Sequence, residues 1–483
     1  MSRLSRRAFV KVAGLGTLAA LAPASVGRVL GANDRIRIAV AGLNGRGGEH
    51  VKQWLGQKGV ELTYLIDPDN RVLAKRSKSL ADKAEPQTIQ DARKALDDKN
   101  LDAISIATPN HWHALMTVWA CQAGKDVYVE KPGSHNVHEG KAAVAAARKY
   151  NRIVQHGTQS RSDPKWRAMA EIVKSGRYGK LLISRGLVYK WGAGPSTRGD
   201  IGLRPNKTPP SELDFNLWLG PARQQPYHEN LVHYRWHWFW DFGNGDIGNQ
   251  GVHQMDIARW MIPGAILPKT AMSLGGRIGF KDQGQTASTQ LAVFDFGGPQ
   301  VIFEVRGFKS KLYPGAKDCD NVLHFEEGTV ADGKFTPKGK TEGEPLPKVE
   351  AERGPGSEGG HFGNFIAAVR SHKTSDLNAP ILEGHYSAAL CHLANISYRL
   401  GEAVPFNSRT KAFGDCKEAY ESLARMEQYL ARKNGLKLDG LQYRLGRKLA
   451  VSAKTESFVD APEANKLLTR PYRKPFAVPE SFS

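Results

Sequence analysis

The sequence predicts an α/β protein in which a doubly wound N-terminal domain is followed by an α+β domain with a mostly antiparallel sheet. Three observations support this prediction. Short apolar strands alternate with helical stretches between residues 35 and 157, a glycine-rich turn follows the first strand, and after Gly157 the pattern changes to alternating strands joined by glycine turns. Strands that alternate with helices at this spacing are typical of a parallel sheet with helices on both faces.

The expected elements follow from runs of apolar residues and their periodicity. In the first half we expect strands at Ile36–Ala41, Val60–Ile66, Leu101–Ala107, Asp126–Val129 and Ile153–His156, and helices at Gly47–Gly56, Ala114–Ala123 and Val137–Tyr150. In the second half we expect strands at Lys180–Tyr189, Thr270–Ile278, Ala287–Phe296 and Gln300–Gly307, and helices at Pro164–Ser175, Val252–Met261, Gly359–Ser371, Glu383–Leu400 and Lys417–Lys433. The second group of strands indicates an antiparallel sheet with one covered face.

Four regions can be distinguished along the chain. Residues 1–32 contain the twin-arginine pattern Ser5-Arg6-Arg7-Ala8-Phe9 and a short apolar stretch. This pattern predicts export by the twin-arginine pathway to the periplasm or another extracytoplasmic location. Residues 33–157 form the expected doubly wound domain, residues 158–400 the second domain, and residues 401–483 a basic C-terminal extension. No apolar stretch reaches the length of about 20 residues that a membrane span needs.

Composition excludes several classes of partner. The formal net charge is +20, but Lys and Arg are scattered along the chain. Nucleic-acid-binding proteins usually show a basic patch interleaved with aromatic residues, or a known module. The sequence has neither, so we expect no nucleic-acid partner. The four cysteines lie far apart without a CxxC pair, and no HExxH-like spacing appears, so we predict no metal site.

The turn Gly42-Leu43-Asn44-Gly45-Arg46-Gly47 follows the first strand and opens the first helix. Glycines at this place let the backbone approach the pyrophosphate of a dinucleotide. Asn44 stands where G-x-G-x-x-G has its second glycine, and asparagine also tolerates unusual backbone angles. The alternative is an ordinary tight turn. We predict that the turn binds a dinucleotide.

Asp67 ends the second strand and distinguishes between the two dinucleotides. A carboxylate at this position binds the adenosine ribose hydroxyls and favours NAD over NADP. Arg71, Lys75 and Arg76 follow closely in the sequence, so NADP stays an alternative. The predicted cofactor is NAD.

Thr108-Pro109-Asn110 follows the third clear strand, at the carboxyl edge of the sheet where open α/β folds bind ligands. In the alternative interpretation this is an ordinary strand-to-helix turn with Asn110 as the N-cap. His111 and His113 flank Trp112, and packing is the first expectation for both.

Lys131 lies between a strand end and Pro132, in Glu130-Lys131-Pro132. Proline restricts the backbone of the residue before it. In a half-buried cleft beside the cofactor, the pKa of this lysine should fall, which would make it a proton donor or acceptor. An exposed, inert lysine is the alternative.

A second polar cluster spans Trp238 to Asp256. Asn249, His253 and Asp256 stand at i, i+4 and i+7, so on one continuous helix they would share a face, with Asp246 one turn earlier. Aromatic rings such as Trp240 cover the apolar faces of a sugar, while His and carboxylate groups handle its hydroxyl protons. The cluster predicts a sugar pocket, with a structural histidine as the alternative.

Together, the glycine loop, Ala107-Thr108-Pro109-Asn110-His111-Trp112-His113, Glu130-Lys131-Pro132 and the helix with His253 resemble the exported, twin-arginine branch of the Gfo/Idh/MocA oxidoreductase family, from about Arg35 to about Leu400. The resemblance implies an N-terminal Rossmann dinucleotide-binding domain. It also implies a C-terminal α+β domain whose open, mostly antiparallel sheet carries the substrate site and often mediates homo-oligomerisation. The usual catalytic groups are the lysine of Glu-Lys-Pro and a D-x-x-x-H pair.

Lys131 and His253 match the family's catalytic groups, whereas Asn249 occupies the aspartate position. Asparagine cannot accept a proton from a hydroxyl. Either Asp246 replaces the missing carboxylate, or Lys131 and His253 share the proton transfer. We favour the second, with Asp246 or Asp256 orienting the histidine. The cofactor contacts implied by the resemblance include His113, Glu130 and Lys131, and the expected substrate contacts are Arg161, Trp240 and Asp256.

The sequence thus predicts an exported NAD-dependent oxidoreductase that acts on a hydroxyl of a sugar, cyclitol or glycoside, a small carbohydrate-like molecule. One alternative is a glycosidase that oxidises, eliminates and reduces with a captive cofactor. Another is a catalytically silent carbohydrate-binding protein, because fold alone does not prove activity.

Overall fold

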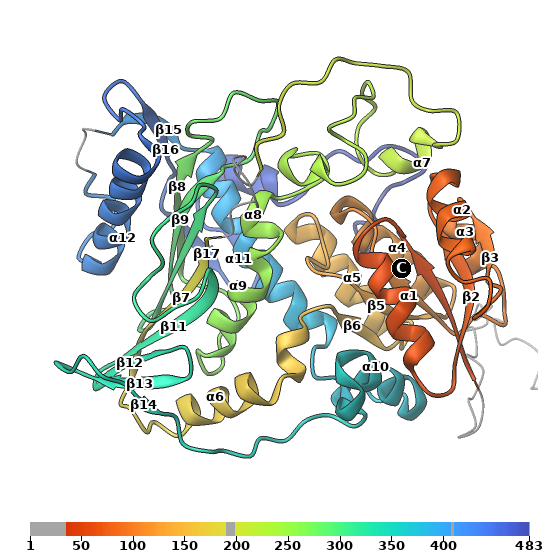
Figure 1. Cartoon of the computed structure of the whole chain (residues 1–483), viewed down its shortest axis with the longest axis horizontal. Helices are drawn as coiled ribbons and strands as arrows, with labels where there is room; N and C mark the ends of the chain where they lie inside the picture. The colour runs from red at the N-terminus through yellow and green to blue at the C-terminus, as the bar shows by residue number, and fades with distance from the viewer. Residues whose placement is uncertain (1–34, 190–198, 407–409, 483) are drawn as a thin grey trace, which may run out of the picture.

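The computed structural model describes residues 35–189, 199–406 and 410–482. These residues form two sheets with helices between and around them (Figure 1). The predicted twin-arginine segment, residues 1–32, lies outside the described residues. Within the described ranges, every helix is too short or too polar to cross a membrane.

The N-terminal sheet has the strand order β3-β2-β1-β4-β5-β6, and all pairs of strands in it are parallel. Its strands are β1 (Ile36–Ala41), β2 (Val60–Ile66), β3 (Gln87–Ile89), β4 (Ala103–Ile106), β5 (Asp126–Val129) and β6 (Val154–His156). Its helices are α1 (Arg46–Gly56), α2 (Asn70–Lys78), α3 (Ala92–Leu96), α4 (Asn110–Gln122) and α5 (Val137–Lys149). The predicted doubly wound domain is confirmed.

Three of these elements, α2, β3 and α3, have no counterpart in the sequence prediction. Leu73 is the buried residue of α2, and two of the three residues of β3 are exposed. A helix and a strand with so little buried surface leave no clear period in the sequence, and α3, which buries Ala92, Ala95 and Leu96, has five residues, too few to show one.

The second sheet has the order β14-β13-β12-β11-β7-β10-β9-β8-β16-β15, with β17 on β8 and β18 on β17. Its strands are β7 (Leu181–Val188), β8 (Thr270–Gly276), β9 (Thr289–Asp295), β10 (Gln300–Arg306), β11 (Cys319–Phe325), β12 (Gly328–Ala331), β13 (Lys334–Pro337), β14 (Glu344–Pro345), β15 (Glu402–Pro405), β16 (Gln442–Leu445), β17 (Leu449–Ser452) and β18 (Ser457–Phe458). Strands β7 and β10 pair in parallel, and the other described pairs are antiparallel. The predicted mostly antiparallel sheet is confirmed.

Helices cover both faces of the second sheet, whereas the sequence predicts one covered face. Helices α9 (Gly251–Trp260) and α11 (Ile381–Arg399) lie on the face toward the N-terminal domain and bury Phe294 and Phe303 (Figure 1). Helix α12 (Lys417–Gln428) lies on the opposite face and buries Leu291 and Ile302. Successive strand residues point to opposite faces, so the C-terminal extension supplies the second cover. The remaining helices are α6 (Pro164–Lys174), α7 (Phe215–Leu219), α8 (Gly245–Gly248), α10 (Gly360–Ser371) and α13 (Pro462–Asn465).

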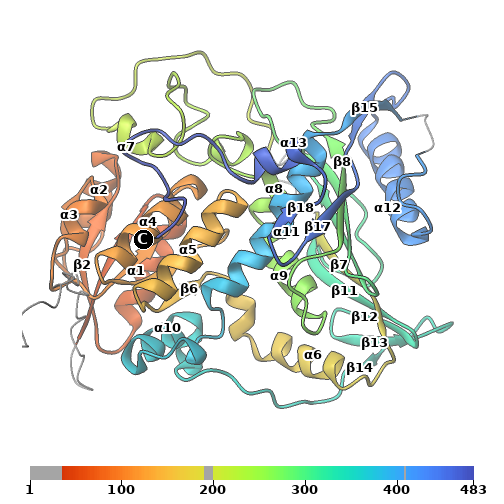
Figure 2. The same ribbon diagram turned by 180° about the vertical axis from the view of Figure 1, so that it is seen from behind.

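The C-terminal extension contacts both halves of the molecule. Its strands β15, β16 and β17 lengthen the second sheet. The chain then runs back over α4 and α5, where it ends (Figure 2). Phe476 packs against Trp112 and Trp119 of α4, with ring centroids 5.5 and 6.2 Å apart. The core of the N-terminal domain therefore includes a residue from the end of the chain.

Residues 201–243, here called the aromatic segment, cross the top of the molecule in Figure 1 and include α7. Apolar side chains of this segment form a hydrophobic cluster of their own: Ile201, Leu213, Trp218, Leu219, Ala222, Tyr227, Leu231, Trp236, Trp238, Phe239 and Phe242. The sequence of this segment shows no helical or strand period, because the segment is held in place by this hydrophobic cluster and not by regular secondary structure.

Candidate active site

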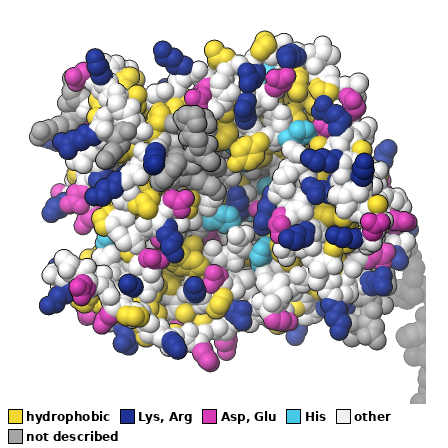
Figure 3. Space-filling model, viewed as in Figure 1, with side chains coloured by type: hydrophobic (Ala, Val, Ile, Leu, Met, Phe, Trp, Pro, Cys, Tyr) yellow, Lys and Arg dark blue, Asp and Glu magenta, His cyan; other side chains and the backbone are white. Residues whose placement is uncertain are grey.

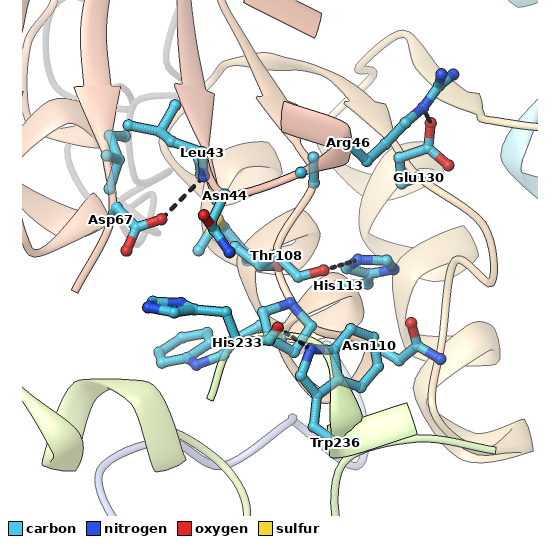
Figure 4. A pocket seen from close by; sticks show the side chains of 18 of the residues that line it. Leu43, Asn44, Arg46, Asp67, Thr108, Asn110, His113, Glu130, His233 and Trp236 are labelled. Atoms are coloured by element: carbon cyan, nitrogen blue, oxygen red, sulfur yellow. Dashed lines mark hydrogen bonds and ion pairs between the residues drawn. The ribbon is translucent and has the colours of Figure 1, made fainter. Parts of the chain in front are cut away.

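A cavity of about 460 Å³ lies between the carboxyl edge of the N-terminal sheet, the start of α9 and the aromatic segment (Figure 4). The predicted residues that line it are Gly42, Asn44, Gly45, Arg46, Asp67, Thr108, Pro109, Asn110, His113, Glu130, Lys131, Asn249 and His253. Histidine side chains are visible where the surface is hollowed between the two halves (Figure 3). The cavity occupies the edge at which open α/β sheets bind ligands.

The glycine loop brings the backbone close to the cavity and begins α1 there. Gly42 has φ 80°, and a Cβ on Gly47 would stand 1.6 Å from the carbonyl oxygen of Gly42. Gly45 has φ 99° and open space where a Cβ would stand. Because the N-terminus of an α-helix presents unpaired N–H groups and a partial positive charge, this loop suits a pyrophosphate.

Asp67 lies at the end of β2 and lines the same cavity. Its Oδ2 accepts a hydrogen bond from the Leu43 N–H at 2.9 Å, and its Oδ1 accepts one from the Asp69 N–H at 3.1 Å (Figure 4). Burial raises the pKa of Asp67 to about 6, although both hydrogen bonds lower it. Arg71, a residue that could have favoured NADP, is paired with Asp69 at 2.6 Å.

The turn after β4 offers two polar atoms to the cavity. Thr108 Oγ1 and Asn110 Nδ2 are buried and find no hydrogen-bond partner among the described residues. Pro109 is the N-cap of α4, so the alternative interpretation of Asn110 as the N-cap is wrong. The His113 ring lies between the Thr108 and Pro132 carbonyl oxygens at 2.8 and 2.6 Å, which joins this turn to the Glu-Lys-Pro turn.

Glu130 connects the glycine loop with the turn that carries Lys131. Its Oε1 accepts hydrogen bonds from Arg46 Nε at 2.6 Å and His50 Nε2 at 3.0 Å, and its Oε2 accepts one from the Lys131 N–H at 3.1 Å. Burial alone would raise the pKa of Glu130, but the bond from His50 and the charge of Arg46 hold it well below its usual range. The carboxylate therefore fixes the glycine loop relative to Lys131.

Lys131 and His253 reach the cavity from different domains. Lys131 Nζ donates to the main-chain oxygen of Asn249 at 3.0 Å and to its Oδ1 at 3.3 Å. Burial, followed by the charge of Lys131, lowers the pKa of His253 to about 3. His253 Nδ1 has no hydrogen-bond partner among the described residues. The structure thus brings a lysine and a neutral imidazole to one cavity.

The helix that the sequence predicts through Asn249, His253 and Asp256 is interrupted. Helix α8 ends at Gly248, Asn249 follows it as the C-cap, and α9 begins at Gly251. Asn249 and His253 still line the cavity, whereas Asp256 is buried on another side of α9. The glycine-rich sequence around Asn249 breaks the helical periodicity on which the prediction rests.

Three predicted substrate contacts lie elsewhere. Arg161 and Asp256 form a buried ion pair at 2.9 Å, and Ser387 donates to Asp256 at 2.6 Å. Trp240 packs under the guanidinium of Arg399, 5.1 Å from the ring centroid. None of the three lines the cavity in the described part of the chain. The structure therefore does not bring these three predicted substrate contacts to the cavity.

The proposed orientation of His253 by a carboxylate also changes. Asp256 is occupied by Arg161 and Ser387, so it does not orient the ring. Asp246 is 2% exposed and, within the described ranges, is not among the cavity-lining residues. In the same ranges, no group of three or more His, Cys, Asp or Glu is arranged to hold a metal ion.

Several cavity residues escape prediction from sequence. They belong mainly to the aromatic segment and include Trp218, His233, Tyr234, Trp236 and His237. The available signal is the density of aromatic residues and histidines between Tyr234 and Trp240. Without a period, that density does not show which rings face the cavity.

Family models match two parts of the chain. Residues 36–158 match the Gfo/Idh/MocA model described as an oxidoreductase family with an NAD-binding Rossmann fold, and residues 165–265 match that family's C-terminal alpha/beta domain.

Two curated relatives match part of the chain. scyllo-Inositol 2-dehydrogenase (NAD(+)) of Bacillus subtilis (strain 168) is 30% identical over 164 residues, 34% of this chain and 47% of the relative. A glycosyl hydrolase family 109 protein of Shewanella pealeana (strain ATCC 700345 / ANG-SQ1) is 26% identical over 207 residues, 37% of this chain and 45% of the relative. The chain therefore spans about half the length of the relatives it matches.

A solved structure shows the same fold. The WlbA dehydrogenase from Bordetella pertussis, crystallised with NADH and UDP-GlcNAcA, has a TM-score of 0.55 at 18% identity, over 76% of this chain and 97% of that one. The parallel sheet, the glycine loop and these matches define a two-domain protein with an NAD-binding Rossmann domain. Residues 36–158 and 165–265 are thus similar to Gfo/Idh/MocA oxidoreductases.

Proposed function

We propose that the protein is an NAD-dependent oxidoreductase that oxidises or reduces a CH–OH group of a sugar, cyclitol or glycoside. One observation supports this most strongly: Lys131 and His253 line the same cavity as the glycine loop and Asp67. A group that transfers protons is thus placed beside a site for a hydride carrier. The inositol dehydrogenase among the relatives supports a polyol as substrate.

The cavity residues fit a dinucleotide. Gly45 leaves open space at the start of α1, where a pyrophosphate would meet N–H groups. Asp67 offers a carboxylate to ribose hydroxyls, and the buried, unpaired atoms Thr108 Oγ1 and Asn110 Nδ2 offer further hydrogen bonds. Bound NAD supplies the hydride acceptor.

Lys131 provides the proton transfer in this proposal. Its amine form accepts the hydroxyl proton as the hydride leaves the same carbon, and its ammonium form returns a proton in the reverse reaction. The two oxygens of Asn249 hold the Nζ atom in the cavity at 3.0 and 3.3 Å. The amide at position 249 thereby positions the lysine without itself exchanging a proton.

His253 binds the reacting hydroxyl as a neutral imidazole. With a pKa of about 3 the ring stays uncharged throughout the neutral pH range. A neutral ring can donate one hydrogen bond and accept another, which orients the hydroxyl toward Lys131.

A turnover assay tests the proposal. The purified protein is incubated with NAD and a panel of inositols, free sugars and methyl glycosides, and the absorbance of NADH is followed. A separate sample is denatured to identify any dinucleotide released. We expect NADH formation with at least one neutral polyol. If no polyol is oxidised and no dinucleotide binds, the proposal is wrong and the silent carbohydrate-binding alternative is favoured.

The glycosyl hydrolase family 109 relative favours a second candidate, a glycosidase that oxidises, eliminates and reduces in one cycle. Oxidation of one hydroxyl to a ketone would acidify the neighbouring C–H, elimination would expel the aglycone, water would add, and the same hydride would return to the ketone. Release of nitrophenol from nitrophenyl glycosides without accumulation of NADH would support this candidate. Accumulation of NADH without nitrophenol would exclude it.

We further propose that the protein is exported and forms homo-oligomers. The pair Arg6-Arg7 and the apolar stretch after it support the twin-arginine route. Replacement of both arginines by lysine should keep the protein in the cytoplasmic fraction of its host, and unchanged export would contradict the route.

Helix α12 covers β8 to β10, so a subunit contact through the second sheet has to include this helix or the strands beside it. Light scattering on the purified protein tests assembly.

A further inference from the structure

One wall of the cavity comes from the aromatic segment. His233, Tyr234, Trp236 and His237 line it. In Figure 4, His233 and Trp236 lie below Asn44 and Thr108 in the view. A dinucleotide bound at the glycine loop is therefore enclosed between the N-terminal sheet and these rings.

The rings of this wall are held in place by the protein. The Trp236 and His237 rings stack with centroids 3.6 Å apart, and Trp236 Nε1 donates to the His233 carbonyl oxygen at 2.8 Å. Trp218 and Phe242 are 3% and 0% exposed, in the core of the segment. A wall that is ordered before binding loses little conformational freedom when a ligand arrives.

The segment is attached to the turn that carries Asp67. The Asp214 N–H donates to the Pro68 carbonyl at 2.9 Å, and the Asn70 N–H donates to the Glu212 carbonyl at 3.0 Å. Asp67 itself accepts the N–H of the next acidic residue in this turn, Asp69. The ribose-binding carboxylate and the aromatic segment therefore share one structural support.

A side-chain contact closes this attachment. His233 Nε2 lies 3.0 Å from Asp69 Oδ2. Asp69 is completely buried and also bonds Arg71. His233 thus connects the cavity wall, of which it is a part, to the turn of the ribose site.

We propose that the aromatic segment retains the cofactor and that the pair His233–Asp69 is its latch. The inference rests on the proposed function, because it takes NAD as the occupant of the cavity. Opening this side of the cavity requires the segment to separate from the turn, so that separation limits release of the dinucleotide. His233 is a positioning residue, and with the latch closed the bound dinucleotide leaves slowly.

Release of NADH tests the latch. The protein is loaded with NADH, mixed with excess NAD in a stopped-flow instrument, and the loss of NADH fluorescence is followed. His233→Ala and Asp69→Ser should each speed release by at least about tenfold, the size expected for a lost bond to a charged group. The double variant should release no faster than the faster single one, because both changes open one latch. Ser at position 69 can still cap α2 but is too short to reach His233.

A matched control separates the latch from a general loosening of the segment. Arg223→Ala breaks the exposed pair Arg223–Asp241, 2.7 Å long, which lies in the same segment but does not line the cavity. Its release rate should stay within about twofold of the wild type, as expected for a surface ion pair. His233→Gln keeps a donor to Asp69 and should keep release slow.

Two results would overturn the inference: unchanged release in both latch variants, or equally fast release in Arg223→Ala. If circular dichroism shows that His233→Ala does not fold, Asp69→Ser and His233→Gln decide. Failure of the proposed function looks different, because the wild type would then bind no NADH at all.

Discussion

The two sheets place their buried charged side chains in different positions. On the N-terminal sheet, Asp67, Glu130 and Lys131 directly follow β2 or β5 and line the cavity. On the second sheet, Arg185 and Glu304 stand within β7 and β10, on the face that α12 covers, and pair at 3.0 Å. The first group faces a space large enough for a ligand, and the second faces its own partners.

Glu304 shows how fully the second group is committed to structure. Besides Arg185, it pairs with Arg306 at 2.8 Å and with Arg425 of α12 at 3.1 Å, and it accepts the Tyr189 hydroxyl at 2.6 Å. Burial would raise its pKa, but the three guanidinium groups lower it to about 2. Perturbed pKa values therefore occur in both regions, and position at a strand end is what separates a candidate site from a structural network.

Loss of Lys131 should have the largest effect. Lys131→Met removes the proposed proton acceptor, and we expect kcat to fall by about 10²- to 10⁴-fold, while NADH affinity and thermal stability change little. Steady-state kinetics and NADH fluorescence titration measure both. Lys52→Met, at an exposed lysine of α1, is the control and should behave like the wild type. Normal turnover in Lys131→Met would show that a charged residue at a strand end of the N-terminal sheet need not be functional.

Loss of Glu304 should affect stability and leave the cavity intact. Glu304→Gln leaves two buried arginines and the half-buried Arg425 without their carboxylate, and we expect the free energy of unfolding to fall by about 3–5 kcal/mol. Urea denaturation measures this. Glu171→Gln breaks the exposed pair with Lys174, 3.9 Å apart, and should cost at most about 0.5 kcal/mol. A change in NADH affinity in Glu304→Gln would show that this network also serves the site.

Loss of Asp67 should weaken cofactor binding without abolishing it. Asp67→Ala removes the carboxylate expected to bind the ribose, and bonds to a charged group of this kind correspond to a rise in the Kd for NADH of about 10- to 100-fold. Fluorescence titration measures the Kd, with the exposed Asp97→Ala as the control. Equal Kd values for both variants would show that Asp67 stabilises the turn but does not bind the cofactor.

The smallest predicted effect is a dependence of NADH binding on pH. Burial raises the pKa of Asp67 to about 6, so the carboxyl group gains a proton as the pH falls below that value and then accepts hydrogen bonds poorly. Between pH 7.5 and 5.5 we expect the affinity for NADH to fall about fourfold by proton linkage. In Asp67→Asn this dependence should disappear. A wild-type affinity that is constant over the range contradicts the role of the carboxylate.

The sequence predicts the parallel sheet and the meeting of the glycine turn with Lys131 because both depend on local patterns, whereas the role of His253 beside Lys131 is implied by the family resemblance. A strand followed by a glycine turn, and a strand followed by Glu-Lys-Pro, place their residues at the same sheet edge whatever the rest of the chain does. The catalytic roles of these residues stay predictions until variants are measured.

The errors have a common physical origin, since they concern contacts between residues distant in sequence. Asp256 is predicted beside His253 by helical spacing, but Asn249 interrupts the helix and Arg161 binds the carboxylate inside the protein. His233 and Trp236 line the cavity because a separate hydrophobic cluster holds their segment there. Neither arrangement leaves a periodic signal.

The return of the chain end to the first domain has a consequence for biosynthesis. Phe476 and Val478 are 2% and 4% exposed within the core that α4 and α5 build. A ribosome releases Phe476 and Val478 long after the strands of the first domain, so that domain waits for these two residues before its packing is complete. The two halves should accordingly gain their full stability together. Removal of the last fifteen or so residues of the sequence should lower the stability of the N-terminal domain most.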